Sequence, residues 1–318
     1  MTIFPWQLDT WVSLLSNKTR LAHAYIFHGN KGAGINRFTE AFVFSLICST
    51  PNQKKFACGK CQDCIWSTTE HPDLKIIRPS EINNKTDSIN VDSIREIKKL
   101  LELTSHKIDG KKIVVIYDAE RLTMAASNAL LKIIEEPPEN TFFVLSTNNL
   151  SYIIPTIISR CLLLSLRKPN KEEALAYLSH TNNNNLLNHL SFYNHSPLEV
   201  IEEKEMQPTI SLIIAELKKG KEINLIDINI NWLSNGLSWT ISFLQKWVYE
   251  IIVFKLTTKN NFFPHNTEDI KKLASMADLS KLLSYNKSLN QVKSISTKPI
   301  NKDITLDSLI IEYKKIFN

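Results

Sequence analysis

Four cysteines that lie close together in the sequence are the residues best suited to chemistry. Cys58, Cys61 and Cys64 are separated by two residues each, and Cys48 lies ten residues upstream at the end of an expected helix. Zinc binds four thiolates in a tetrahedron at about 2.3 Å, and closed sites of four cysteines are structural. The spacing therefore predicts a structural Zn²⁺ site. His71 is an alternative to Cys48 as the fourth ligand, and reduced, buried thiols are the alternative to any metal site.

A glycine-rich turn precedes the cysteines and follows the apolar run Ala24–Phe27. Strand, glycine loop and helix form the layout of a P-loop, whose backbone N–H groups and helix N-terminus face a phosphate. When G-x-x-x-x-G-K-S/T is aligned on Gly29 and Gly34, Ile35 occupies the lysine position and Asn36 the Ser/Thr position. The side chains that would neutralise phosphates and hold magnesium are absent, which indicates a degenerate nucleotide site.

A second acidic position of nucleotide hydrolases also differs here. Asp118 follows an apolar run, where such enzymes hold magnesium, but the next residue is Ala119 instead of a water-positioning glutamate. Glu120 lies one residue further, and on an extended strand this shift turns a side chain to the opposite face. We therefore expect Asp118 to cap the following turn. With the substitutions in the glycine loop, this predicts loss of hydrolysis.

Ser159-Arg160-Cys161 stands just before the last expected strand. From position alone, Arg160 as an exposed surface residue is the simpler interpretation, because exposed arginines are common. The alternative is an arginine that projects into the nucleotide site of a neighbouring subunit. Cys161 is far from the cysteine cluster and is expected to pack as a small apolar residue. Thr147-Asn148, after another strand, are expected to be turn residues.

The elements that position these residues differ between the two halves of the chain. In the first half, apolar runs of strand length alternate with helical patterns, which predicts a parallel sheet with helices on both faces. The expected strands are Ala24–Phe27, Leu74–Arg78, Ile113–Tyr117, Thr141–Leu145 and Leu162–Leu166. The expected helices around them are Phe4–Asn17, a helix through Phe38, Phe42 and Leu46, Asp92–Ser105 and Thr123–Glu136.

From Lys168 onward the pattern is helical throughout. The expected helices are Lys171–Ser179, Pro197–Lys204, Ile210–Lys218, the long stretch Ile228–Leu256, Thr267–Leu283 and Leu306–Phe317. In the long stretch, Trp232, Trp239 and Trp247 recur at helical spacing, most simply as a core stripe and alternatively as a subunit interface.

Composition bounds the class of protein. The 318 residues are 43% apolar and 22% charged, as in soluble globular proteins, and the net charge of +6 permits a nucleic acid or acidic partner without indicating one. The apolar segment Leu237–Leu256 is interrupted by charged residues, which favours a buried helix over a membrane span. The N-terminus has no secretion pattern. Together with the clustered cysteines, this predicts a cytoplasmic protein.

These residues as a set resemble the δ′ subunits of the bacterial DNA polymerase III clamp loader. The resemblance rests on the N-terminal PW followed by HAYIFHG, the cysteine module after the loop helix, His71-Pro72-Asp73, the segment NALLKIIEEPPENTFFVLSTN and Ser159-Arg160-Cys161. It covers residues 4–166, and the helical remainder agrees in length and order.

The resemblance implies an α/β AAA+ P-loop NTPase-like domain at residues 1–167, with a five-stranded parallel sheet and a zinc module inserted at 48–64. It implies a small helical lid at 168–207 and an all-α collar for oligomerisation at 208–318. The γ and τ motor subunits of that family keep an intact loop and acidic pair. Ile35, Asn36 and Ala119 therefore group this chain with δ′, as does Leu198, aligned with a lid arginine of the motors.

The resemblance also implies a function and reverses the interpretation of Arg160. In the family this arginine, with Ser159 before it, reaches the ATP site of the adjacent motor subunit. The expected protein is a non-hydrolysing subunit of the polymerase holoenzyme that completes that site in trans during loading of the sliding clamp. Its expected partners are γ/τ and δ, and through the complex the β clamp and primer–template DNA, with no membrane.

Two other functions are weighed against this one. An ATP-hydrolysing γ/τ-like motor with an unusual P-loop requires turnover by the isolated chain. A zinc-containing nucleic-acid binder that acts alone requires tight, strongly salt-dependent binding by the monomer.

Overall fold

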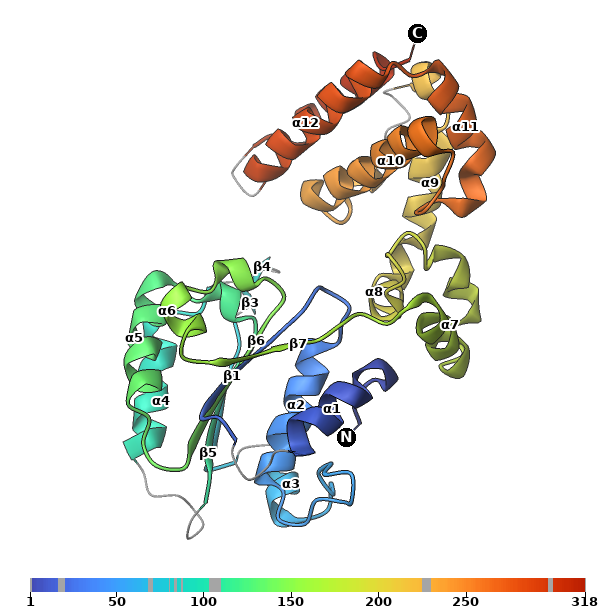
Figure 1. Ribbon diagram of the computed structural model, residues 1–318. Helices are drawn as coiled ribbons and strands as arrows, with labels where there is room; N and C mark the ends of the chain where they lie inside the picture. The colour runs from blue at the N-terminus through green and yellow to red at the C-terminus, as the bar shows by residue number, and fades with distance from the viewer. Residues whose placement is uncertain are drawn as a thin grey trace. The chain divides into compact units, whose positions relative to one another are not determined.

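The computed structural model describes residues 2–16, 21–67, 71–79, 81–82, 85–86, 88–102, 110–224, 230–296 and 300–317. Contacts divide the chain into two compact units, Met1–Glu173 and Ala174–Asn318. The units are drawn in Figure 1, in which the first runs from blue to green and the second continues to red.

The first unit is built on a five-stranded sheet with the order β2-β5-β6-β1-β7, in which every neighbouring pair is parallel. Its strands are β1 (Ala24–His28), β2 (Leu74–Ile77), β5 (Lys112–Ile116), β6 (Thr141–Thr147) and β7 (Leu162–Ser165). The five predicted strands and their parallel pairing are confirmed. The first unit therefore has the expected α/β fold, with helices around a five-stranded parallel sheet.

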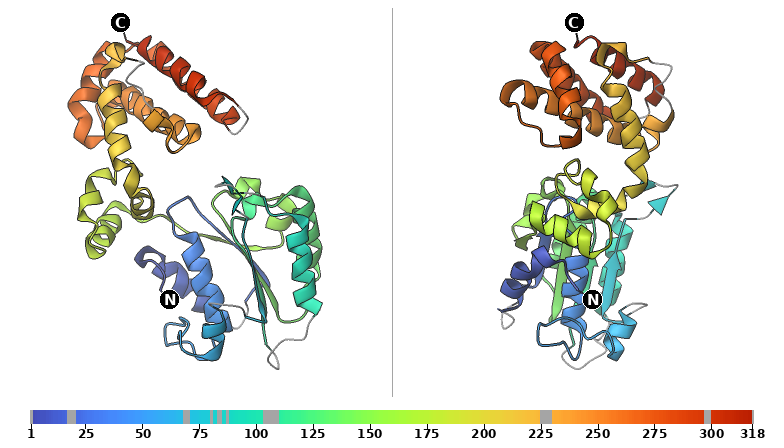
Figure 2. Two further views of the ribbon diagram at one scale, coloured as in Figure 1. Left: turned by 180° about the vertical axis from the view of Figure 1, so that it is seen from behind. Right: turned by 90° about the vertical axis from the view of Figure 1, so that its right-hand side faces the viewer.

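Helices cover both faces of this sheet, as Figure 1 shows and Figure 2 shows from behind. Successive residues of β1 alternate between two apolar clusters: Tyr25 and Phe27 pack on the side of α1 and α2, and Ala24 and Ile26 on the side of α4 and α5. This two-sided burial explains the continuous apolar runs of the strands. The helices are α1 (Leu8–Ser16), α2 (Ile35–Ile47), α3 (Gln62–Trp66), α4 (Val91–Glu102), α5 (Met124–Glu135) and α6 (Pro155–Ile158).

Local signals set most of these boundaries. Thr123 caps α5, since its hydroxyl accepts the N–H of Ala126, and the helix ends before Pro137 as expected. The end expected for α4 at Ser105 lies outside the described residues. One feature was not predicted, an antiparallel ribbon of β3 (Glu81–Ile82) and β4 (Lys85–Thr86), whose strands are too short to form a pattern.

The second unit is helical and has one buried apolar cluster that includes residues from Ala174 to Phe317. Trp232 and Trp247 are buried in it, and Trp239 packs against it, which confirms the core stripe. Its α-helices are α7 (Lys171–His180), α8 (Pro197–Glu202), α9 (Gln207–Leu217), α10 (Leu237–Thr257), α11 (Thr267–Met276), α12 (Leu279–Ile295) and α13 (Lys302–Lys314). No helix in the described part of the chain is long and apolar enough to cross a bilayer.

Two long helices predicted here are wrong because tertiary contacts break them. The helix expected at Thr267–Leu283 is two helices, since Ala277 is extended and forms a bridge with Phe317, and Asp278 caps α12 by accepting the N–H of Lys281. The stretch expected from Ile228 is divided at Gly236, where φ is +81° and α10 begins. The separation of the second unit into lid and collar remains a proposal.

A buried hydrogen-bonded chain crosses the core of the second unit. The indole N–H of Trp247 donates to the Tyr313 hydroxyl at 2.9 Å, and that hydroxyl donates to the carbonyl of Leu217 at 2.9 Å. Tyr285 lies beside it, with ring centroids 5.9 Å apart, but its hydroxyl has no hydrogen-bond partner among the described residues. Two equally buried tyrosines therefore differ in what their hydroxyls bind.

We predict that Tyr313→Phe lowers the free energy of unfolding by about 1–3 kcal/mol, because it leaves the Trp247 N–H and the Leu217 carbonyl unsatisfied. The matched control, Tyr285→Phe, removes a hydroxyl without such bonds and should change stability by less than about 0.5 kcal/mol. Urea unfolding followed by far-ultraviolet circular dichroism measures both. Equal losses in the two variants would contradict the assignment.

Candidate functional site: cysteine cluster, glycine loop and Arg160

The four cysteines predicted as ligands lie together, from the end of α2 at Cys48 to Cys64 within α3. Their sulfur atoms all lie within 4.8 Å of one another, with 3.9 Å between Cys48 and Cys61 and 3.9 Å between Cys58 and Cys64. A metal that binds four sulfurs at about 2.3 Å in a tetrahedron separates them by about 3.8 Å. The set therefore fits one tetrahedral ion.

Hydrogen-bond donors surround the sulfur of Cys58 and favour its charged form. Cys58 Sγ accepts hydrogen bonds from the Thr50 hydroxyl at 3.4 Å and from the N–H groups of Lys60 at 3.4 Å and Cys61 at 3.3 Å. These donors lower the pKa of Cys58 to about 5. Burial acts in the opposite direction on Cys64 and raises its pKa to about 12. The thiolate is the metal ligand, so the amide donors prepare the loop for a cation.

His71, the alternative fourth ligand, is not in this group of sulfurs. Its Nδ1 accepts the N–H of Asp73 at 3.0 Å, and its Nε2 lies 3.7 Å from a carboxylate oxygen of Asp63. Asp63 also accepts the hydroxyl of Ser49, the residue after Cys48. His71 thus supports the loop through Asp63, and Cys48 completes the cluster.

The glycine loop lies against the N-terminal segment of the chain. Gly34 has a φ of +82°, and a Cβ there would lie 2.4 Å from the ring of Phe4. Two side chains bind the loop carbonyls: the Trp6 indole N–H donates to Ala33 at 3.1 Å, and the Gln7 amide donates to the same oxygen at 2.8 Å. The loop is therefore held by residues 4–7 of its own chain.

The two degenerate positions of the loop are used for structure. Ile35, at the lysine position, is buried in the apolar cluster that contains Phe38 and Phe42. Asn36, at the Ser/Thr position, accepts the Ser146 hydroxyl at 3.0 Å, which joins the start of α2 to β6. One position thus adds to the core and the other fixes the helix to the sheet.

The region after β5 differs from the expectation. The side chain of Asp118 makes no capping hydrogen bond to the following 3₁₀ turn (Ala119–Arg121), and its carbonyl accepts the N–H of Arg121 at 2.9 Å instead. Because the chain turns here, with φ of +50° at Asp118, the argument from strand alternation does not apply. Glu120 consequently faces the end of β6, where it accepts the N–H of Asn148 at 3.3 Å. Burial, followed by the charge of Glu120, raises the pKa of Asp118.

Arg160 lies before β7, away from the glycine loop. β7 pairs with β1 so that Leu162 is opposite Tyr25, whereas the loop residue Gly29 lies against the carbonyl of Leu166. The four steps from Leu162 to Leu166 span about 13 Å at 3.3 Å per residue. Arg160 precedes Leu162 and is therefore at the opposite end of the strand pair from the loop.

The guanidinium of Arg160 is partly exposed and is held by its own surroundings. It donates to the Thr156 carbonyl at 3.0 Å and pairs with Glu135, at the end of α5, at 2.7 Å. The exposed fraction of the Arg160 side chain is 40%. Large apolar side chains near it in the sequence are also exposed, including Tyr152, Leu162 and Leu163.

The other residues singled out from the sequence pack or form hydrogen bonds within the fold. Cys161 packs against the cluster on the α4–α5 side, and burial raises its pKa to about 12. Thr147, expected in a turn, is instead the last residue of β6, and its hydroxyl accepts the N–H of Asn149 at 3.0 Å. Leu198 lies in the first turn of α8, which Ser196 caps.

Sequence reasoning missed the side chains that hold these sites from a distance. Trp6, Gln7, Ser146 and Glu135 each contact a predicted residue or loop from another element. Trp6 and Gln7 are 26–27 residues from their acceptors, and Ser146 is 110 residues from Asn36. No local spacing reports such contacts, and only the PW dipeptide near the start gave a signal.

Comparison with known proteins agrees with these features. A family model described as "DNA polymerase III, delta subunit" matches residues 7–170. DNA polymerase III subunit delta′ of Pseudomonas aeruginosa is 27% identical over 292 residues, which cover 89% of this chain and 84% of that protein. The subunit delta′ of Buchnera aphidicola subsp. Baizongia pistaciae is 26% identical, with coverage of 100% and 99%. The subunit delta′ of Escherichia coli is 33% identical over 183 residues, with coverage of 56% and 53%.

Among solved structures, a DNA polymerase III gamma subunit-related protein from Thermotoga maritima matches with a TM-score of 0.47 and 17% identity. That match covers 98% of this chain and 99% of the other.

Proposed function

The chain belongs to the δ′-subunit family of DNA polymerase III, and on this premise we propose that it is a non-hydrolysing stator of the clamp loader. In this proposal its Arg160 enters the ATP site of a neighbouring motor subunit. ATP bound there then promotes loading of the sliding clamp on primed DNA. The observation that carries the proposal is the placement of Arg160 and the glycine loop at opposite ends of the paired strands β1 and β7.

The surroundings of the glycine loop support the absence of hydrolysis in cis. A lysine at the position of Ile35 would neutralise phosphate charge, but the side chain there is apolar and buried. The Ser/Thr oxygen that would hold magnesium is replaced by Asn36, which is bound to Ser146. Ala119 supplies no carboxylate next to Asp118. ATP bound at this loop would therefore meet neither the lysine nor the metal ligands.

The surroundings of Arg160 support a role in trans. It lies beyond reach of its own loop, and its ion pair with Glu135 is partly exposed, so exchanging that partner for a phosphate costs about 0.2–1 kcal/mol. The exposed Tyr152, Leu162 and Leu163 provide apolar area of the kind that protein interfaces bury. An arginine that enters in trans stabilises charge on the transferred phosphoryl group, by about 10³–10⁵ in rate in GTPases.

The cysteine cluster supports a structural Zn²⁺ site in the same proposal. Cys48, Cys58, Cys61 and Cys64 would hold the ion, which when bound would link the end of α2 to α3. Four protein ligands leave no open position for substrate, so the ion has no place in the chemistry of ATP. The zinc module spans residues 48–64.

The partners follow from the family and not from any contact in the chain. We propose γ/τ and δ as neighbours in a hetero-pentameric ring, and the β clamp and primer–template DNA as partners through that ring. Residues 168–207 and 208–318 would act as lid and collar.

Glu120 is the observation that favours the alternative, a γ/τ-like motor, because it faces the end of β6 as a water-positioning acid would.

The stator proposal is tested by Arg160→Ala in the reconstituted loader. We expect the purified variant to assemble normally. The ATPase activity of the complex should fall by the fraction that comes from the one ATP site that Arg160 completes. Arg160→Lys should not restore the activity, since lysine lacks the planar fork of arginine. Arg95→Ala, on the exposed face of α4, is the control and should leave activity unchanged. Normal activity of assembled Arg160→Ala complexes would contradict the proposal.

The zinc proposal is tested by the metal content of the purified chain. We expect about one zinc per wild-type chain and a clear loss in Cys61→Ser, because a closed four-thiolate site loses a ligand. The control Cys161→Ser removes a thiol outside the cluster and should retain the metal. A wild-type chain purified without zinc would remove this part of the proposal.

A further inference from the structure

A cavity lined by charged side chains lies in the second unit, apart from the sites described above. It is a groove of about 1020 Å³ between α12 and α13, closed at one end by the turn Gly220–Glu222. Five lysines and one glutamate line it, which gives the groove four net positive charges. Its charged residues are Lys221, Lys281, Lys287, Lys314, Lys315 and Glu312.

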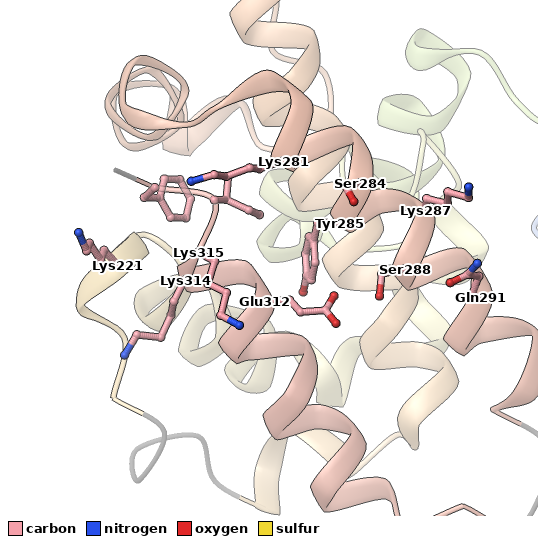
Figure 3. Close-up of a pocket in the computed structure, with 12 residues that line it drawn as sticks. Lys221, Lys281, Ser284, Tyr285, Lys287, Ser288, Gln291, Glu312, Lys314 and Lys315 are labelled. Carbon is pink, nitrogen blue, oxygen red and sulfur yellow. The ribbon is translucent and has the colours of Figure 1, made fainter.

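The lysines lie at both ends of the groove and around its rim. In Figure 3, Lys221, Lys314 and Lys315 are at one end and Lys287 is at the other, with Ser288 and Gln291 beside it. Lys314 is engaged with the carbonyl of Ile223 at 2.6 Å. Within the described residues, the ammonium groups of Lys221, Lys287 and Lys315 have no hydrogen-bond or ion-pair partner. Uncompensated lysines on a concave surface attract an anion.

The floor of the groove contains a buried donor. Tyr285 is only 3% exposed and its hydroxyl has no hydrogen-bond partner among the residues described, although buried hydroxyls are normally satisfied. Figure 3 shows this side chain pointing between the two helices toward Glu312 and Ser288. Burial, with the charges of Tyr313 and Glu312, raises the pKa of Tyr285, so the hydroxyl stays protonated and can donate.

We propose that this groove binds the phosphate backbone of duplex nucleic acid, without reading its sequence. Lysine is a compact point charge that suits phosphate, and hydroxyl and amide side chains such as Ser288 and Gln291 make similar contacts. From Lys281 to Gln291 the face of α12 advances by about 15 Å. Measured along the axis of a duplex, that length corresponds to about four base-pair steps at 3.4 Å.

Two competing occupants agree less well with the lining. Unpaired strands are held by exposed aromatic platforms, but the aromatic residues of the groove, Tyr285 and Phe317, are buried. An acidic peptide is more often bound by the bidentate fork of arginine, and the described residues that line the groove include no arginine. The inference goes beyond the proposed function, since it involves neither Arg160 nor the glycine loop.

The test is fluorescence anisotropy of a labelled 20-base-pair duplex of mixed sequence with the full-length chain. We expect weak binding, with a dissociation constant of about 10⁻⁴–10⁻⁶ M at physiological salt, that strengthens as salt is lowered. The triple variant Lys221→Gln/Lys287→Gln/Lys315→Gln should weaken binding at least about tenfold at low salt. It should also reduce the slope of log K against log salt by about 2–3.

The matched control is Lys204→Gln/Lys259→Gln/Lys272→Gln, which removes the same charge from exposed positions outside the groove. It should change affinity less than about threefold. Glu312→Gln should act in the opposite sense and tighten binding, because Glu312 is the one acidic side chain among the described lining residues.

Four results would overturn the proposal. These are no duplex binding at low salt, equal losses in the two triple variants, tighter binding of the unpaired strand, and groove-dependent binding of poly-glutamate that exceeds that of the duplex. Unfolding midpoints of the variants establish that each loss comes from binding. ATPase activity of the reconstituted loader is measured separately, so failure here is distinguishable from failure of the stator proposal.

Discussion

The direction of the strands is the constraint on which the arrangement of the first unit depends. Because all five strands of the sheet are parallel, their carboxyl ends meet at one edge. The glycine loop after β1, Asp118 after β5 and Thr147 at the end of β6 are collected there. Arg160 precedes its strand and pairs with Glu135 at the end of α5, so it belongs to the opposite edge. One sheet thus separates a loop that resembles a nucleotide site from the partly exposed guanidinium of Arg160.

The loop itself is stabilised by hydrogen bonds from distant side chains. Carbonyls of Ala33 and Gly34 accept hydrogen bonds from Trp6 and Gln7, and Asn36 is bound to Ser146. Each buried bond of this kind contributes about 0.5–1.5 kcal/mol, and an unsatisfied partner costs more. The glycine loop is therefore tied to the N-terminal segment and to β6 by its own hydrogen bonds.

Features of the fold and the site that depend on residues close together in the sequence could be predicted, and those that depend on distant contacts could not. The strands followed from continuous apolar runs such as Ile113–Tyr117, and the cysteine cluster followed from spacing within one short segment. The break at Ala277 and the direction of Glu120 could not be predicted, because a bridge to Phe317 and a turn with positive φ at Asp118 override the periodicity. The partners of the glycine loop were equally hidden, since they come from distant parts of the sequence. Arg160 could be singled out by resemblance, but its distance from the loop required the register of β7 on β1.

The most direct test of the central claim is ATP turnover by the purified chain alone. If the scaffold has lost its own catalysis, the isolated chain should release no phosphate above the background of the buffer, even at saturating ATP and magnesium. Phosphate release that Asp118→Ala abolishes would contradict the account and identify the chain as a motor subunit.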